Sequence, residues 1–120
     1  ISGGVATPLY TYGHIDVAIY STRDSVNVTI RNNYSKSVNL IELKICNYTV
    51  SLNNTVLSPG FTVSFTLKNI SKEVCIGRLT YSVDNRLFNK LFTVNRVVDN
   101  MSFEYYEFSN YTSRSTYPHG

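Results

Sequence analysis

Charged residues are scarce in this sequence, and several residue types that mark particular kinds of protein are rare or missing. Only 16% of the 120 residues are charged, whereas about 25% is usual in soluble domains. Tryptophan is absent, and the chain holds two cysteines and two histidines. Lysine and arginine are spread along the chain, and the net charge is only +3. Without a basic cluster, the sequence lacks the electrostatic pattern of nucleic-acid binding, so we expect no nucleic-acid partner.

Long hydrophobic runs are missing as well. No stretch approaches the roughly 18 apolar residues of a membrane-spanning helix, and no basic segment followed by an apolar one opens the chain. We therefore expect no membrane span in the mature chain. The first residue is Ile1 rather than Met, which fits the removal of an export signal, although a trimmed chain would begin in the same way. We accordingly expect an extracellular protein.

The motifs of common catalytic and cofactor sites are also absent. There is no G-x-S-x-G elbow for a serine nucleophile. Gly3 and Gly4 lack the lysine and the helix that follow in a phosphate-binding loop. His14 and His119 are the only histidines, and neither lies in a short cluster with metal-ligand spacing. We predict that the protein is not an enzyme and binds no cofactor or metal.

Two acidic residues near the C-terminus, Glu104 and Glu107, suggest the paired carboxylates of glycoside hydrolases. On a strand, however, residues three positions apart point to opposite faces of the sheet. We therefore interpret them as two solvated charges.

Apolar and polar residues alternate with period two along most of the chain, and β-branched and aromatic side chains are abundant. The alternation predicts strands at residues 15–19, 26–30, 38–50, 61–67, 74–83, 87–94 and 97–108. About seven short strands in a chain of one domain's length are typical of a sandwich or a barrel. We predict a single all-β, immunoglobulin-like sandwich of antiparallel strands over residues 13–120.

The segment 38–50 differs from the other predicted strands. Its run from Leu40 to Leu43 predicts burial on both faces or a bulge, so we expect a central strand here. Turn-like residues at 22–24 and 84–85 predict hairpins between the strands on either side. The polar segment 109–120 is expected to be mobile.

The two cysteines, Cys46 and Cys75, both lie in apolar stretches that are predicted to be strands. Neighbouring strands bring cysteines close enough to bridge. In an exported chain we therefore predict a disulfide between them, which would stabilise the fold by about 3.5 kcal/mol in the chain-entropy model. The alternative is a pair of buried free thiols in a cytosolic protein.

Asn-x-Ser/Thr sequons are unusually frequent. Composition alone would give about three of them, and the chain contains seven. They lie at Asn27, Asn33, Asn47, Asn53, Asn69, Asn100 and Asn110. N-linked glycans at these positions would supply the surface hydration that the few charges do not. We predict a heavily N-glycosylated protein.

The first twelve residues form an extended, uncharged segment, which we interpret as a strand over residues 1–9 followed by a linker. One face of this strand is mostly apolar and carries Ile1, Gly3, Val5, Thr7 and Leu9. Such a strand can add to an exposed sheet edge and place alternate side chains in a groove. If the groove is its own, the segment is the first strand of the fold. If the groove belongs to the next molecule, the pairing repeats and builds a filament.

In these features the chain resembles the thread-like pilus subunits of thermoacidophilic archaea, which are exported, heavily glycosylated β-proteins joined by donor-strand complementation. The resemblance rests on the tail at residues 1–9, the seven sequons, the surface rich in Ser, Thr, Asn and Tyr, and the scarcity of acidic residues, which suits an acidic exterior. It implies a structural subunit of an extracellular cell-surface filament. Identical subunits would polymerise head to tail, each inserting its N-terminal strand into the groove of its neighbour.

A second function stays open. A secreted, glycosylated carbohydrate- or receptor-binding sandwich would use a cluster of aromatic residues near the C-terminus as its binding face. The cluster consists of Phe103, Tyr105, Tyr106, Phe108 and Tyr111. Aromatic residues on strands are, however, more often packed into the core.

Overall fold

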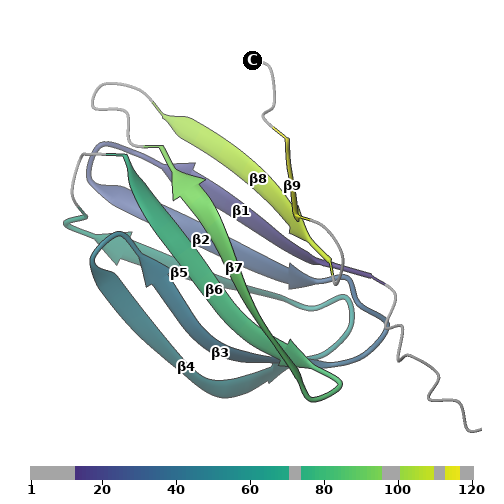
Figure 1. Ribbon diagram of the computed structural model, residues 1–120. Helices are drawn as coiled ribbons and strands as arrows, with labels where there is room; N and C mark the ends of the chain where they lie inside the picture. The colour runs from purple at the N-terminus through teal and green to yellow at the C-terminus, as the bar shows by residue number, and fades with distance from the viewer. Residues whose placement is uncertain (1–12, 71–73, 96–100, 110–112, 117–120) are drawn as a thin grey trace, which may run out of the picture.

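The computed structural model describes residues 13–70, 74–95, 101–109 and 113–116, and these residues form nine strands in two sheets (Figure 1). The strands are β1 (Ile15–Ser21), β2 (Ser25–Asn32), β3 (Val38–Ile45), β4 (Tyr48–Leu57), β5 (Thr62–Lys68), β6 (Cys75–Val83), β7 (Arg86–Val94), β8 (Ser102–Phe108) and β9 (Ser113–Thr116). Within these ranges the structure contains no helix of the length and hydrophobicity that a membrane crossing requires.

The sheets are antiparallel and pack face to face, with strand orders β5-β2-β1-β8-β9 and β4-β3-β6-β7 (Figure 1). Immunoglobulin-like sandwiches share this arrangement: their second and fifth strands lie in one sheet, and their third, sixth and seventh strands lie in the other. The predicted all-β sandwich is therefore confirmed. It has nine strands instead of about seven because the predicted strand at residues 38–50 is divided into β3 and β4, and because β9 follows β8.

The period-two pattern accounts for the core between the sheets. In β1 the side chains of Ile15, Val17 and Ile19 are fully buried, and in β2 every second residue from Val26 to Ile30 is buried. These two strands form the predicted hairpin, and β6 and β7 form the other. Both β1 and β2 thus place their apolar faces against the opposite sheet.

The predicted strand at residues 38–50 is wrong in one respect, because the chain turns at Cys46 and Asn47 between β3 and β4. Cys46 adopts a left-handed backbone conformation with φ of 57°. The turn is only two residues long and apolar residues lie closely on both sides of it, so the sequence pattern predicts one strand. The predicted bulge is present as a register shift between Leu40 and Glu42. As expected of a central strand, β3 lies between two neighbours, β4 and β6.

The strand β9 lies in the polar C-terminal segment that was expected to be mobile. It pairs antiparallel with β8 at the edge of the five-stranded sheet. Backbone hydrogen bonds hold such an edge strand, so its sequence needs no apolar alternation. The prediction of a mobile segment is therefore wrong for residues 113–116.

Candidate functional site

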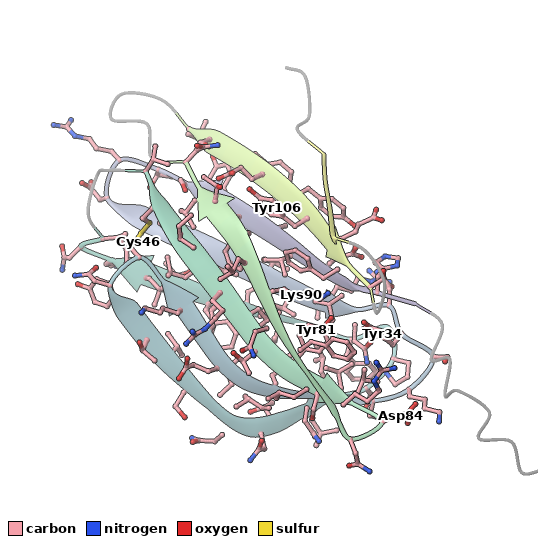
Figure 2. All side chains as sticks on the ribbon, viewed as in Figure 1. Tyr34, Cys46, Tyr81, Asp84, Lys90 and Tyr106 are labelled. Atoms are coloured by element: carbon pink, nitrogen blue, oxygen red, sulfur yellow. A yellow bond between two sulfur atoms is a disulfide. The ribbon has the colours of Figure 1, made fainter. Side chains whose placement is uncertain are left out.

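The predicted disulfide is present and joins Cys46 to Cys75, whose Cα atoms lie 5.2 Å apart (Figure 2). It links the turn after β3 to the first residue of β6, and both cysteines pack against the core. The N–H of Cys46 also donates to the carbonyl of Ile76, at 3.2 Å. The bridge therefore fastens two adjacent strands at one end of the four-stranded sheet.

The asparagines of the predicted glycosylation sites differ in accessibility. Asn47, Asn53 and Asn69 are exposed, and the last two have positive φ. Asn27 and Asn33 are half-buried, and their side-chain amides donate hydrogen bonds to neighbouring side chains. The side-chain amide nitrogen is thus far more accessible at Asn47, Asn53 and Asn69 than at Asn27 and Asn33.

Some predicted site residues lie outside the described part of the chain. These are the donor-strand residues Ile1, Gly3, Val5, Thr7 and Leu9, the sequon asparagines Asn100 and Asn110, and Tyr111 of the aromatic cluster.

The aromatic cluster near the C-terminus is divided between the two faces of β8. Tyr106 and Phe108 are buried and pack on Phe92 of the opposite sheet, with ring centroids 5.6 and 6.2 Å from it. Phe103 is exposed and Tyr105 half-buried on the outer face. Successive residues of a strand point to opposite sides, so the cluster does not form one binding surface.

Glu104 lies on the inner face of β8 and is only 1% exposed. Its carboxylate accepts hydrogen bonds from the backbone N–H and the side-chain amide of Asn95, at 2.7 and 3.0 Å. The Tyr106 hydroxyl lies 2.9 Å from the same carboxylate and 2.8 Å from the carbonyl of Thr93. The interpretation of Glu104 as a solvated charge is therefore wrong, although Glu107 does point to the opposite face.

The strongest candidate for an interaction site is the edge strand β7. Among the described strands it pairs with β6 alone, in a register that runs unbroken through all nine of its residues. Its outward side chains include Leu87 and Leu91, which are 61% and 64% exposed. Val74 and Ile76, at the start of β6, are also mostly exposed. We call Val74, Ile76, Leu87 and Leu91 the apolar edge.

Two other edges of the sandwich are protected in ways that β7 is not. In β4 the residues Asn53 and Asn54 both have positive φ, which interrupts the strand. In β5 the outward residues include Thr62, Ser64 and Thr66. Interrupted edges and polar outward faces are common means of preventing strand addition. Of these three edges, β7 is thus the one that is both uninterrupted and apolar.

A shallow hollow of about 480 Å³ adjoins the apolar edge and the disulfide. Val74, Ile76 and Leu91 supply its apolar part, and Lys44 and Arg78 supply positive charge. None of the described residues that line it is acidic. The hollow thus suits an apolar group that carries no positive charge.

The inner face of β7 is closed at one end of the strand and partly open at the other. Phe92 is buried, whereas Phe88 and Lys90 are half-buried. Phe88 stacks on Tyr81 with ring centroids 5.3 Å apart, and Lys90 Nζ lies 5.4 Å from the Phe88 centroid (Figure 2). Burial lowers the pKa of Lys90. The edge therefore presents apolar surface on both sides of the strand.

A signal for this edge is present in the sequence. Leu87-Phe88 and Leu91-Phe92 place apolar residues on both faces of one strand, yet a two-faced apolar pattern is also typical of a buried central strand. Only the strand order shows that β7 lies at an edge.

Comparison with protein-family models, with curated proteins and with solved structures found no match to this chain.

Proposed function

We propose that this protein is a structural subunit of an extracellular filament, in which the N-terminal strand of one subunit adds to the β7 edge of the next. The apolar β7 edge, which pairs with β6 alone among the described strands, is the observation that carries the proposal. A long, flat, apolar edge strand is a template for pairing with another chain. Head-to-tail addition of this kind repeats without closing, so it builds a fibre.

Side-chain burial and backbone pairing would both contribute to the contact. Covering side chains as exposed as Leu87 and Leu91 is worth about 1 kcal/mol or more for each. An added strand also satisfies the N–H and C=O groups along the open side of β7. Side-chain burial and backbone pairing together favour binding of a strand with alternating apolar residues over binding of an unstructured segment.

The first nine residues of the chain have the composition that this edge requires. They contain no charged side chain, and one of their faces is mostly apolar. Their number equals the nine residues of β7. No side chain of this segment brings a positive charge toward Lys44 and Arg78 beside the hollow.

N-glycosylation belongs to the same proposal. The exposed sequon asparagines Asn47, Asn53 and Asn69 lie on turns and on β4, and none of them lies on β7. Glycans at Asn53 and Asn69 would hydrate the surface away from the β7 edge, whereas Asn47 lines the hollow beside the apolar edge, so a glycan there would border the proposed contact. A thread-like pilus of the kind formed by thermoacidophilic archaea stays a prediction from the sequence resemblance.

The decisive experiment compares polymerisation of the full chain with that of three variants. Deletion of residues 1–9 removes the proposed donor, and Leu91→Lys places a charge on the proposed acceptor. Val56→Lys is the matched control, because Val56 is 61% exposed on the other edge of the same sheet. Sedimentation and negative-stain microscopy measure the polymer, and circular dichroism checks the fold of each variant.

We expect the deletion and Leu91→Lys to give folded monomers and Val56→Lys to polymerise like the wild type. Mixing the two monomeric variants should then give dimers but no filaments, since one variant retains only the donor and the other only the acceptor. Filaments formed by the truncated chain would contradict the proposal.

The carbohydrate-binding alternative has one observation in its favour. A second hollow, of about 620 Å³, lies on the outer face of the five-stranded sheet and combines the ring of Tyr105 with the polar side chains of Asp16, Arg31 and Asn33. Aromatic and hydrogen-bonding groups together can hold a sugar ring. A chain that stays monomeric and is retained on a sugar resin would favour this function.

A further inference from the structure

Three potential metal ligands meet on the outer face of the five-stranded sheet, away from the β7 edge. His14 precedes β1, Asp16 lies in β1, and Glu107 lies opposite Asp16 in β8. His14 and Asp16 are two residues apart and so lie on the same side of the extended chain. One ligand atom from each of the three residues lies within 4.8 Å of the others. We propose that His14, Asp16 and Glu107 bind a divalent transition-metal ion such as Zn²⁺.

Asp16 is the centre of the group and is only 7% exposed. Its Oδ1 atom accepts no hydrogen bond, although His14 Nε2 lies 3.0 Å away. A buried carboxylate oxygen without a donor is unfavourable. His14 and Glu107 offer further ligand atoms near the Asp16 carboxylate, so a cation bound among them would satisfy it.

The second oxygen of Asp16 is held in place by its neighbours. Asn33 Nδ2 donates a hydrogen bond to Oδ2. Burial, together with the nearby Asp16 carboxylate, raises the pKa of the Tyr105 hydroxyl. Arg31, opposite Asp16 on β2, donates from Nε to Asn33 Oδ1. Groups of this kind orient a metal-binding carboxylate and reduce the entropy that it loses on binding.

The charges around the group also favour a cation. Asp16 and Glu107 are directly opposed across two strands, and like charges in that position destabilise a sheet. Two positive groups lie near Asp16: the His14 ring, when protonated, and Arg31, which is opposite Asp16 on β2. In the register of β8 and β9, Arg114 is opposite Glu107. Among the ion pairs of the described residues none joins Arg31 to Asp16.

One imidazole and two carboxylates define the class of metal. Zn²⁺ and similar divalent ions bind imidazole and carboxylate together. Ca²⁺ and Mg²⁺ prefer ligand sets made only of oxygen. Three protein ligands leave a coordination position for water, as in open zinc sites. The inference is independent of the filament proposal, because none of these residues belongs to the β7 edge.

The test is titration of the metal-stripped full chain with ZnCl₂ by isothermal calorimetry, with melting temperature as a second readout. His14→Ala and Glu107→Gln each remove one ligand. Two variants serve as controls. His119→Ala removes the only other histidine, and Glu42→Gln removes a carboxylate of the four-stranded sheet, where Glu42 pairs with Arg78. We expect one Zn²⁺ per wild-type chain and a melting temperature that rises with Zn²⁺ and falls again with a chelator.

His14→Ala and Glu107→Gln should weaken binding by about tenfold or more, while the two controls bind as the wild type does. His14 precedes the first strand and is half-buried, so its variant keeps the test valid if Glu107→Gln fails to fold. Equal Zn²⁺ affinity in wild type and His14→Ala would overturn the proposal. So would loss of binding in His119→Ala, or the absence of saturable binding in the wild type.

Discussion

The hydroxyl oxygens of Tyr34 and Tyr81 lie 3.1 Å apart in the interior of the sandwich (Figure 2). Tyr34 follows β2 in one sheet, and Tyr81 belongs to β6 in the other. Both side chains are buried, and their ring centroids are 6.2 Å apart. Burial raises the pKa of both phenols. Both hydroxyls therefore stay protonated in the folded protein under conditions that ionise an exposed tyrosine.

We predict that stability falls above about pH 10, where tyrosines of the unfolded chain ionise. A group whose pKa is raised by folding contributes stability that is fully present below its unfolded pKa and is lost as the pH rises through its folded pKa. Urea-unfolding midpoints measured across the alkaline range should therefore decline. Tyr34→Phe should make the decline shallower, and Tyr48→Phe, at an exposed position, should not. An alkaline profile that is the same in both variants would rule out the buried pair as its cause.

Glu104→Ala should lower the free energy of unfolding by about 2–4 kcal/mol, because it leaves the half-buried donors of Asn95 without their acceptor. Glu42→Ala is the control. Its carboxylate is partly exposed and pairs with Arg78 at 2.9 Å, and such pairs contribute about 1 kcal/mol or less. Urea denaturation of both variants measures the difference, and equal losses would show that Glu104 has no special structural role.

Gly77→Ala should destabilise the protein by about 1–3 kcal/mol, since the new methyl group would collide with the buried Phe92 ring across the β6–β7 pair. The double variant with Phe92→Leu should lose less than the sum of the two single changes, because the smaller side chain makes room. Gly60→Ala tests the cost of backbone strain instead of collision, because there is open space around Gly60 but its φ of 82° is unfavourable for alanine. Additive losses in the Gly77 and Phe92 variants would refute the collision.

Glycan occupancy should follow the exposure of the asparagine amide. We expect high occupancy at Asn47, Asn53 and Asn69, and low occupancy at Asn33, whose Nδ2 is engaged by Asp16. Glycopeptide mass spectrometry of the native protein measures each site. Full occupancy at Asn33 together with bare Asn47 and Asn69 would reverse the prediction.

The amino-acid sequence by itself determined where most strands begin and which of their residues are buried. Alternation with period two is a local property, because each residue's side of the sheet follows from its neighbours along the strand. The hairpins β1–β2 and β6–β7 are therefore predictable from the turn residues between them. The pairing of Cys46 with Cys75 follows from there being only two cysteines, both in apolar stretches.

The tertiary structure alone decided the order of the strands, and with it both candidate sites. Whether the two-faced apolar strand β7 is central or at an edge depends on which strands pair with it, which no local pattern encodes. The pairing of β1 with β8 places Asp16 opposite Glu107, although they lie near opposite ends of the sequence. The same pairing turns Glu104 inward to Asn95. Strand pairing is set by long-range backbone hydrogen bonds and by packing of the whole core, so these contacts exist only once the sandwich has formed.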